Sequence, residues 1–236
     1  MSDHHRGLAG VSGRLTPAVR MGLSIGLATG LYAISFGALA VAAGLSVAQT
    51  TALSLLMFTG GSQFAYVGVL AGGGLGPSAT AAASLLGIRN AIYGVPMNAL
   101  LRPTGWRRVA QAQLTIDESV ATASAQDSPD EPRRGFWAAG IAVYVFWNTF
   151  TIVGALLGQA LGDTRAWGLD GAAVAAFLGL LWPRLKGREP LAIAAVSAVA
   201  TVLVVPFAPP GIPIVVAAAV AAVMTWLQPR SRQVAR

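Results

Sequence analysis

The chain has 236 residues, of which 55% are hydrophobic and 11% are charged, and it contains no cysteine. A soluble domain carries roughly 25% charged residues, so the composition excludes an ordinary soluble fold, and the lack of cysteine excludes disulfides and thiolate metal sites. The net charge of +7 is explained by basic loops on the cytoplasmic side of a membrane, and no stretch interleaves basic and aromatic residues, so we expect no nucleic-acid partner.

The chain is a succession of apolar segments, several of them long enough to cross ~30 Å of hydrocarbon as helices. Residues 1–17 are predicted to form a polar tail, residues 102–134 a long polar loop, and residues 229–236 a basic tail. About seven hydrophobic segments are expected, over residues 18–43, 50–71, 77–101, 136–161, 168–183, 190–206 and 211–228. The predicted fold class is an all-α polytopic membrane protein, with a single transmembrane domain over residues 18–228 in the lipid bilayer.

Segment one carries glycines that recur at steps of four and seven residues. They are Gly22, Gly26, Gly30, Gly37 and Gly44. Steps of this size place the glycines on one side of a helix, where a neighbouring helix can approach closely. We therefore expect segment one to pack tightly against another helix along this side.

Segment two is interrupted by the stretch FTGGSQF, residues 58–64. Gly60 and Gly61 weaken a helix, and Ser62 and Gln63 are polar at the depth where the bilayer is driest. Irregular backbone persists at this depth only where protein or a water-filled cavity surrounds it. We therefore predict a discontinuous helix that faces a cavity.

Segment three contains Pro96, which removes a helical hydrogen bond, so the helix is expected to bend just after Asn90. Consecutive discontinuous or kinked helices near the membrane midplane build the solute sites of secondary transporters. Segments two and three are therefore the predicted place of a solute site.

All but two of the 16 basic residues fall in four groups. These groups precede segment one, occupy the 102–134 loop, separate segments five and six, and end the chain. If all four are cytoplasmic, as basic loops tend to be, the second half of the chain makes four clean crossings and the C-terminus is cytoplasmic.

The first half of the chain does not give an equally consistent topology. Three full crossings from a cytoplasmic N-terminus would put the 102–134 loop outside. Either segment two is re-entrant or split, or the N-terminus is outside, which would give a seven-helix, three-one-three arrangement. We favour the cytoplasmic N-terminus.

Arg89 lies in the middle of segment three, ~18 Å from either end if the segment is helical. Its guanidinium offers paired donors that match the two oxygens of a carboxylate. No acidic residue is expected at this depth, because Asp117 and Glu118 are assigned to the loop. We therefore expect Arg89 to hold a substrate's carboxylate, and a buried salt bridge or a cap on carbonyls freed by Pro96 is the structural alternative.

The candidate substrate-binding residues come from both segments. Gln63 both donates and accepts hydrogen bonds, which suits a zwitterion, although an interhelical hydrogen bond is an equal alternative. Tyr93 lies one turn beyond Arg89 and would line the same cavity. The full set is Gly60, Gly61, Ser62, Gln63, Arg89, Asn90 and Tyr93.

Two rival functions come from other classes. An intramembrane enzyme would need Cys, His, Asp or Glu at mid-depth, and the apolar segments offer none, so we expect no catalytic residue, metal or cofactor. A purely structural membrane subunit would bind no solute and would tolerate Arg89→Leu. Trp147, Trp182 and Trp226 are assigned to packing or to the membrane interface.

Several stretches resemble the AzlC family, the large subunits of bipartite branched-chain amino-acid exporters. They are ISFGALAVAAGLS (34–46), FTGGSQF (58–64), RNAIYG (89–94), TIDESVA (115–121) and WGLDGAAVAAFLGLL (167–181). The resemblance extends from segment one over nearly the whole chain, and FTGGSQF is its most specific part. Gly60, Ser62, Gln63, Arg89 and Tyr93 match the family pattern.

The resemblance implies export of valine, leucine, isoleucine and sometimes methionine across the bacterial cytoplasmic membrane. It also implies a small hydrophobic partner subunit of the AzlD type, and association with a second copy of the chain stays open. Gly87 and Asn90 depart from the pattern, since the family often has asparagine and histidine at these positions. A proton-coupling role of that histidine therefore cannot be transferred to this chain.

Overall fold

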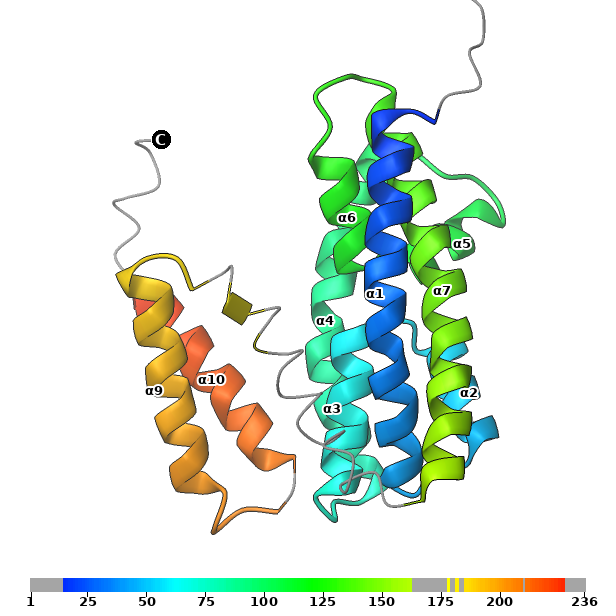
Figure 1. Ribbon diagram of the computed structural model, residues 1–236. Helices are drawn as coiled ribbons and strands as arrows, with labels where there is room; N and C mark the ends of the chain where they lie inside the picture. The colour runs from blue at the N-terminus through cyan, green and yellow to red at the C-terminus, as the bar shows by residue number, and fades with distance from the viewer. Residues whose placement is uncertain (1–14, 163–177, 179–180, 183–184, 210, 228–236) are drawn as a thin grey trace, which may run out of the picture.

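The computed structural model describes residues 15–162, 178, 181–182, 185–209 and 211–227, and these form helices with short connections and no strand (Figure 1). The helices are α1 (Pro17–Ala42), α2 (Val47–Leu56), α3 (Gly60–Ala71), α4 (Gly76–Leu101), α5 (Arg107–Leu114), α6 (Asp117–Ser124), α7 (Glu131–Leu161), α9 (Arg188–Val204) and α10 (Ile212–Leu227). Most of predicted segment five lies outside the described residues, so the number of membrane crossings stays a prediction.

Helices α1 and α7 form the centre of the bundle and run side by side in the same direction (Figure 1). At their starts, the backbone amide of Ala18 donates to Glu131 over 3.3 Å. Near their other ends, Ala38 lies against Gly158. Within the described part of the chain, these are the two helices that are long and apolar enough to cross a membrane, with mean hydropathies of 1.8 and 1.7.

The side of α1 that carries the glycines faces α7. A Cβ built on Gly22 would lie 2.7 Å from the backbone nitrogen of Ala139, and one built on Gly37 would overlap the carbonyl oxygen of Thr151. The predicted close approach is confirmed for Gly22, Gly26, Gly30 and Gly37. Gly44 is different, because it lies beyond the end of α1 in a turn with a φ of 94°.

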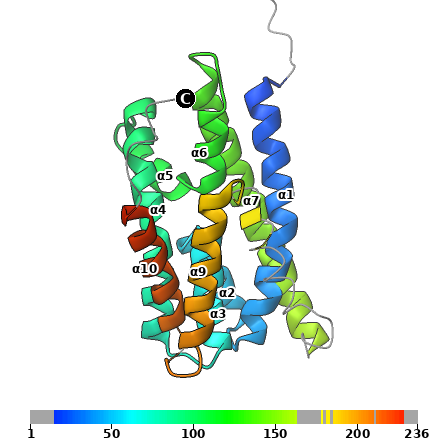
Figure 2. The same cartoon turned by 90° about the vertical axis from the view of Figure 1, so that its left-hand side faces the viewer.

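Segment two folds as a hairpin of two short helices, α2 and α3, separated by residues 57–59. The carbonyl of Leu55 accepts from Tyr144, in the middle of α7, at 3.4 Å. At the far end of α3, Val69 packs against Ala79 at the start of α4. The hairpin thus enters the bundle from the end where α1 finishes, reaches the middle and returns (Figure 2). The break precedes Gly60, which begins α3, instead of falling within the glycine pair.

Helix α4 runs from Gly76 to Leu101 as one helix that contains Pro96, so segment three is not discontinuous, and its bend after Asn90 stays a prediction. The carbonyl of Leu101 accepts from Arg133 in the first turn of α7, so α4 ends where α1 and α7 begin. Because the α2–α3 hairpin turns back, the start of α1 and the ends of the 102–134 region lie at the same end of the bundle. The alternative that separates these two regions across the membrane is therefore wrong.

The predicted 102–134 loop contains a second hairpin, made of α5 and α6. Its tip reaches the middle of α4, where the carbonyl of Thr115 accepts from Asn90 at 3.0 Å. Helix α6 then rises along α7, and Ser119 and Thr122 on it are fully buried. The sequence missed this hairpin because its short helices are polar, and their burial depends on α7. The two hairpins enter the bundle from opposite ends.

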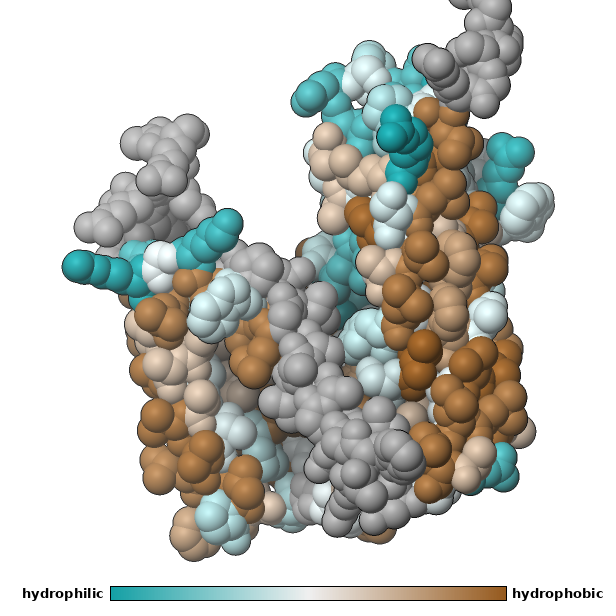
Figure 3. Space-filling model, in the orientation of Figure 1, coloured by the Kyte–Doolittle hydropathy of each residue, from teal (hydrophilic) through white to brown (hydrophobic). Residues whose placement is uncertain are grey.

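Apart from Arg89, the described basic residues gather at one end of the molecule. Figure 3 shows hydrophilic residues at the upper end of the bundle and of α9, with a hydrophobic surface below. The basic side chains at this end are Arg20, Arg102, Arg107, Arg108, Arg133, Arg134, Lys186 and Arg188. Among the described lysines and arginines, Arg89 alone lies at mid-depth.

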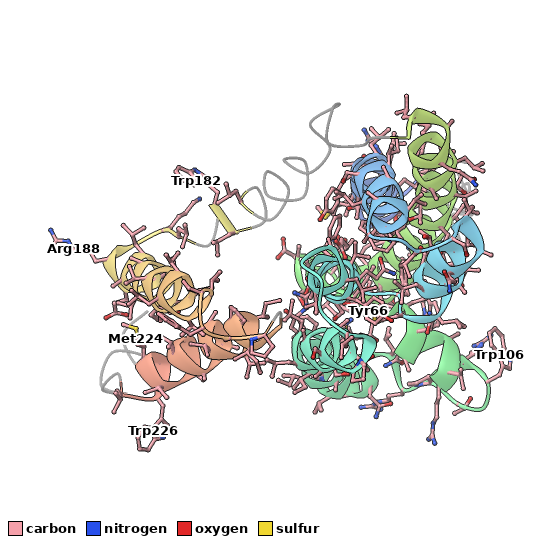
Figure 4. All side chains as sticks on the ribbon, turned by 90° about the horizontal axis from the view of Figure 1, so that it is seen from below. Tyr66, Trp106, Trp182, Arg188, Met224 and Trp226 are labelled. Atoms are coloured by element: carbon pink, nitrogen blue, oxygen red, sulfur yellow. The ribbon has the colours of Figure 1, made fainter. Side chains whose placement is uncertain are left out.

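Helices α9 and α10 form a separate pair that packs beside α3 and α4 (Figure 2). The contact is made near the start of α10, where Ile214 packs against Val69 and Ala79. Trp226, at the end of α10, points away from the bundle and is 76% exposed (Figure 4). Trp182 is equally outside any packed core. Of the two roles expected for these tryptophans, their exposure favours the membrane interface.

The contact between α1 and α7 leads to a stability prediction. Gly37→Ala places a methyl group against the backbone of α7, which cannot move aside, so we expect a loss of about 1–3 kcal/mol of stability. Gly68→Ala is the matched control, because a Cβ there meets nothing within 4 Å. The melting temperature of the purified protein in detergent measures both. Equal melting temperatures for the two variants would contradict the close contact.

The hairpin arrangement leads to an accessibility prediction that the cysteine-free chain makes simple to test. Cysteines introduced at Ala48 and Leu75, at the two feet of the α2–α3 hairpin, should react with an impermeant thiol reagent from the same side of the membrane. A cysteine at Ser128 should react from the opposite side. If segment two crossed the membrane completely, Ala48→Cys and Leu75→Cys would instead react from opposite sides.

Candidate functional site

The tips of the two hairpins meet at Asn90, in the middle of α4. Its Oδ1 accepts from the Thr59 hydroxyl at 3.5 Å, and its Nδ2 donates to the carbonyl of Thr115 at 3.0 Å. The tips also meet directly, because Gln113 Nε2 donates to the carbonyl of Leu55 at 2.8 Å. Asn90 therefore ties both hairpins to α4.

Arg89 forms an ion pair with Asp117, the first residue of α6. The distance from Nη2 to Oδ2 is 3.1 Å, and Nε of Arg89 also donates to Asn90 Oδ1 at 3.4 Å. The expectation that no acidic residue lies at this depth is therefore wrong, because the α5–α6 tip carries Asp117 into the bundle. The pair is not sealed, since 32% of the Arg89 side chain and 26% of the Asp117 side chain are exposed.

Asp117 keeps one carboxylate oxygen free of internal contacts. Its Oδ1 is buried and has no hydrogen-bond partner among the described residues. Asp117 is the first residue of α6, so its carboxylate lies at the positive end of that helix's dipole. The pair therefore consists of two ions in contact, with one anionic oxygen left over.

The N-terminus of α3 lies directly beside Arg89. A Cβ built on Gly61 would be 2.8 Å from Nη2 of Arg89, so a larger residue here would push the guanidinium away from α3. Thr59 provides no side-chain cap for the first turn of α3. The hydroxyl of Ser62 is fully buried, has no hydrogen-bond partner among the described residues, and faces α4 beside Gly87.

Gln63 has a different environment from its neighbours, because its amide is used within the protein. Nε2 donates to the carbonyls of Ser54 and Met57, at 3.3 and 2.8 Å, and Oε1 accepts from Trp147 Nε1 at 2.8 Å. Gln63 thus satisfies the carbonyls freed at the end of α2, where water would otherwise be needed. This geometry supports the interhelical alternative for Gln63.

The remaining candidates lie around this centre. Gly60 faces the ring of Trp147, which packs in the core as expected, and Tyr93 is half-buried one turn above Arg89 on α4. The structure therefore brings Gly61, Ser62, Arg89 and Asn90 together and adds Asp117 to them. An acidic pair followed by serine at the start of a short polar run is a helix-start signal, which could have revealed α6 in TIDESVA.

This arrangement provides binding groups for both charges of a zwitterion. Arg89, the uncapped amides of α3 and the Ser62 hydroxyl are donors for an anionic group. Asp117 is an acceptor for a cationic group. The side chains lie where two hairpins from opposite ends meet, so a small polar solute bound here would be halfway through the bundle.

Comparison with known proteins places the chain in a family. A family model described as AzlC protein matches residues 24–161, which is more than half of the chain and includes both hairpins. No curated protein and no solved structure matches it. The match covers the helices that position Arg89, Asn90 and Asp117, and the chain belongs to the AzlC family of membrane proteins, which is associated with transport.

Proposed function

We propose that the protein exports branched-chain or similar small apolar amino acids across the bacterial cytoplasmic membrane. The observation that carries this proposal is the Arg89–Asp117 pair, held at the middle of the bundle and still partly exposed. Burying a charged pair at this depth costs free energy. Charged residues within a membrane therefore commonly mark the pathway of a solute. The basic end of the bundle is assigned to the cytoplasm, because basic segments stay on that side.

The carboxylate of the amino acid would bind between Arg89 and the first turn of α3. Arg89 Nη1 and Nη2 both lie close to Gly61, so the guanidinium lies beside the first turn of α3. A half-helix N-terminus with an arginine beside it is a preferred environment for a carboxylate in a transporter.

An apolar substrate side chain is supported by the surface next to this pair. Ile92 lies one turn above Arg89 on α4 and is 62% exposed, and Ile88 is 54% exposed. Burial of a branched aliphatic side chain against such a surface contributes about 25 cal/mol per Å². The family resemblance supports the same substrates and a small AzlD-like partner subunit.

The two rival functions make different use of the same pair. A structural subunit would use Arg89 and Asp117 only to hold α4 to α6. An enzyme would use Asp117, which lies at mid-depth, in acid–base chemistry. We favour transport over the enzyme, because the Asp117 carboxylate is already engaged by Arg89 in an ion pair.

The first functional prediction concerns the shape of the cation. Arg89→Lys keeps the charge, and with it the attraction to Asp117, but loses the planar fork. We expect leucine export per inserted molecule to fall about tenfold or more, as for loss of a charge-assisted hydrogen bond. The measurement is efflux of labelled leucine from vesicles, normalised to the amount of protein in the membrane. Unchanged specific export would contradict a carboxylate role for Arg89.

A double variant separates binding from a structural role of the pair. Arg89→Leu alone leaves Asp117 without its counterion and should reduce the amount of folded protein. Arg89→Leu with Asp117→Leu removes both charges, and such replacements are often neutral for stability. We expect this double variant to insert normally and to export no leucine. Normal export by the double variant would support the structural subunit.

A second prediction concerns the close approach of α3 to Arg89. Gly61→Ala puts a methyl group where the guanidinium now lies, so Arg89 must shift away from the α3 amides. We expect leucine export to fall while the melting temperature changes little, since the obstructed group is the end of a side chain. Gly68→Ala on the same helix is again the control, and it should export normally.

A further inference from the structure

We propose that Asp117 binds the α-ammonium group of the substrate, so that an amino acid replaces the internal Arg89–Asp117 pair with two separate contacts. The inference rests on the proposed function, and it adds the residue that recognises the second charge of the substrate. It also states the chemical class that the site selects, which is a zwitterion with an ammonium group and a carboxylate on the same carbon atom.

The geometry of Asp117 supports a cationic ligand. Its Oδ2 contacts Arg89 at 3.1 Å, while Oδ1 is buried without a hydrogen-bond partner among the described residues. A buried anionic oxygen without a donor is costly, and an ammonium group supplies up to three donors. The partial exposure of both side chains leaves the pair open to a solute that competes with it.

Donors for the carboxylate come from α4 and from the first turn of α3. They are the guanidinium of Arg89, the first-turn amides of α3 next to Gly61, and the Ser62 hydroxyl. Ser62 is 1% exposed, and its hydroxyl also has no hydrogen-bond partner among the described residues. Two buried polar atoms, the anionic Oδ1 of Asp117 and the hydroxyl of Ser62 beside Gly87, therefore lack a hydrogen-bond partner among the described residues.

Charge pairing explains why a zwitterion would be preferred. A solute with only a carboxylate would bind Arg89 and leave Asp117 without a counterion, and a solute with only an ammonium group would leave Arg89 without one. Each stranded charge costs free energy in a site that is mostly shielded from water. An amino acid leaves neither charge stranded, so the internal pair can open without loss.

Three ligands that share one carbon skeleton test the proposal. L-leucine carries both charges, isocaproate lacks the ammonium group, and isoamylamine lacks the carboxylate. Binding to the full-length protein in lipid nanodiscs is measured by the ligand-dependent rise in melting temperature, and export by flux into vesicles. The wild-type protein should bind leucine at least about tenfold more tightly than either analogue, as expected where a buried charge is left unpaired.

Asp117→Asn removes the anionic charge with little change in shape. We expect leucine binding to weaken about tenfold or more and isocaproate to bind as well as leucine, because the ammonium group no longer has a partner. Asp127→Asn removes the same charge from an exposed position and should keep the wild-type preference. If Asp117→Asn fails to fold, Asp117→Glu keeps the charge and moves it, and leucine binding should then fall more than isocaproate binding.

The outcomes separate the two proposals. If the wild-type protein neither binds nor exports leucine, the proposed function fails, and the role of Asp117 fails with it. If leucine is exported and Asp117→Asn still prefers leucine over isocaproate by the wild-type ratio, the role of Asp117 alone is overturned. A structural role for Asp117 would change the amount of folded protein but would leave this ratio unchanged.

Discussion

A helix that ends inside a membrane exposes backbone groups that no water can satisfy, and this constraint governs the whole bundle. Helices α2 and α5 end at mid-depth, and α3 and α6 begin there. The carbonyls at the ends of α2 and α5 and the amides at the starts of α3 and α6 therefore need partners from the protein. Gln63 satisfies the end of α2, and Asn90 joins the two tips. Polar side chains in the apolar core are thus a consequence of where the helices stop.

The long helices provide the frame that makes these interrupted helices possible. Helices α1 and α7 are parallel and almost in backbone contact along their glycines, so they occupy little width and leave one side of α7 for both hairpins. Each hairpin then packs against α7, through Ser54 and Thr151 from one end and through Leu114 and Gly140 from the other. The glycines of α1 therefore contribute to the site although none of them is near it.

The sequence predicted those parts of the fold that depend on local pattern. Apolar length predicted α1, α4 and α7, and the glycine spacing predicted the face of α1 that meets a neighbour. The position of α6 could not be predicted in this way, because its polar residues are buried only through contacts with α7. The partner of Arg89 was missed for the same reason, since residues 89 and 117 become neighbours only through the tertiary fold. The sequence nevertheless identified Arg89 as a charge at mid-depth, and the two hairpin tips meet beside it.

The opposite entry of the two hairpins has a consequence for the passage of a solute. Withdrawal of the α2–α3 tip alone would uncover Arg89 and Asp117 toward one compartment, while the α5–α6 tip still covered them from the other. Withdrawal of the α5–α6 tip would open the site toward the other compartment and would carry Asp117 away from Arg89, because Asp117 belongs to that tip. Because the Asn90 side chain bonds both tips at once, the resting arrangement keeps both covers in place, and a leak requires two separate sets of hydrogen bonds to break together. The bundle thus has one short cover for the site on each side of α4.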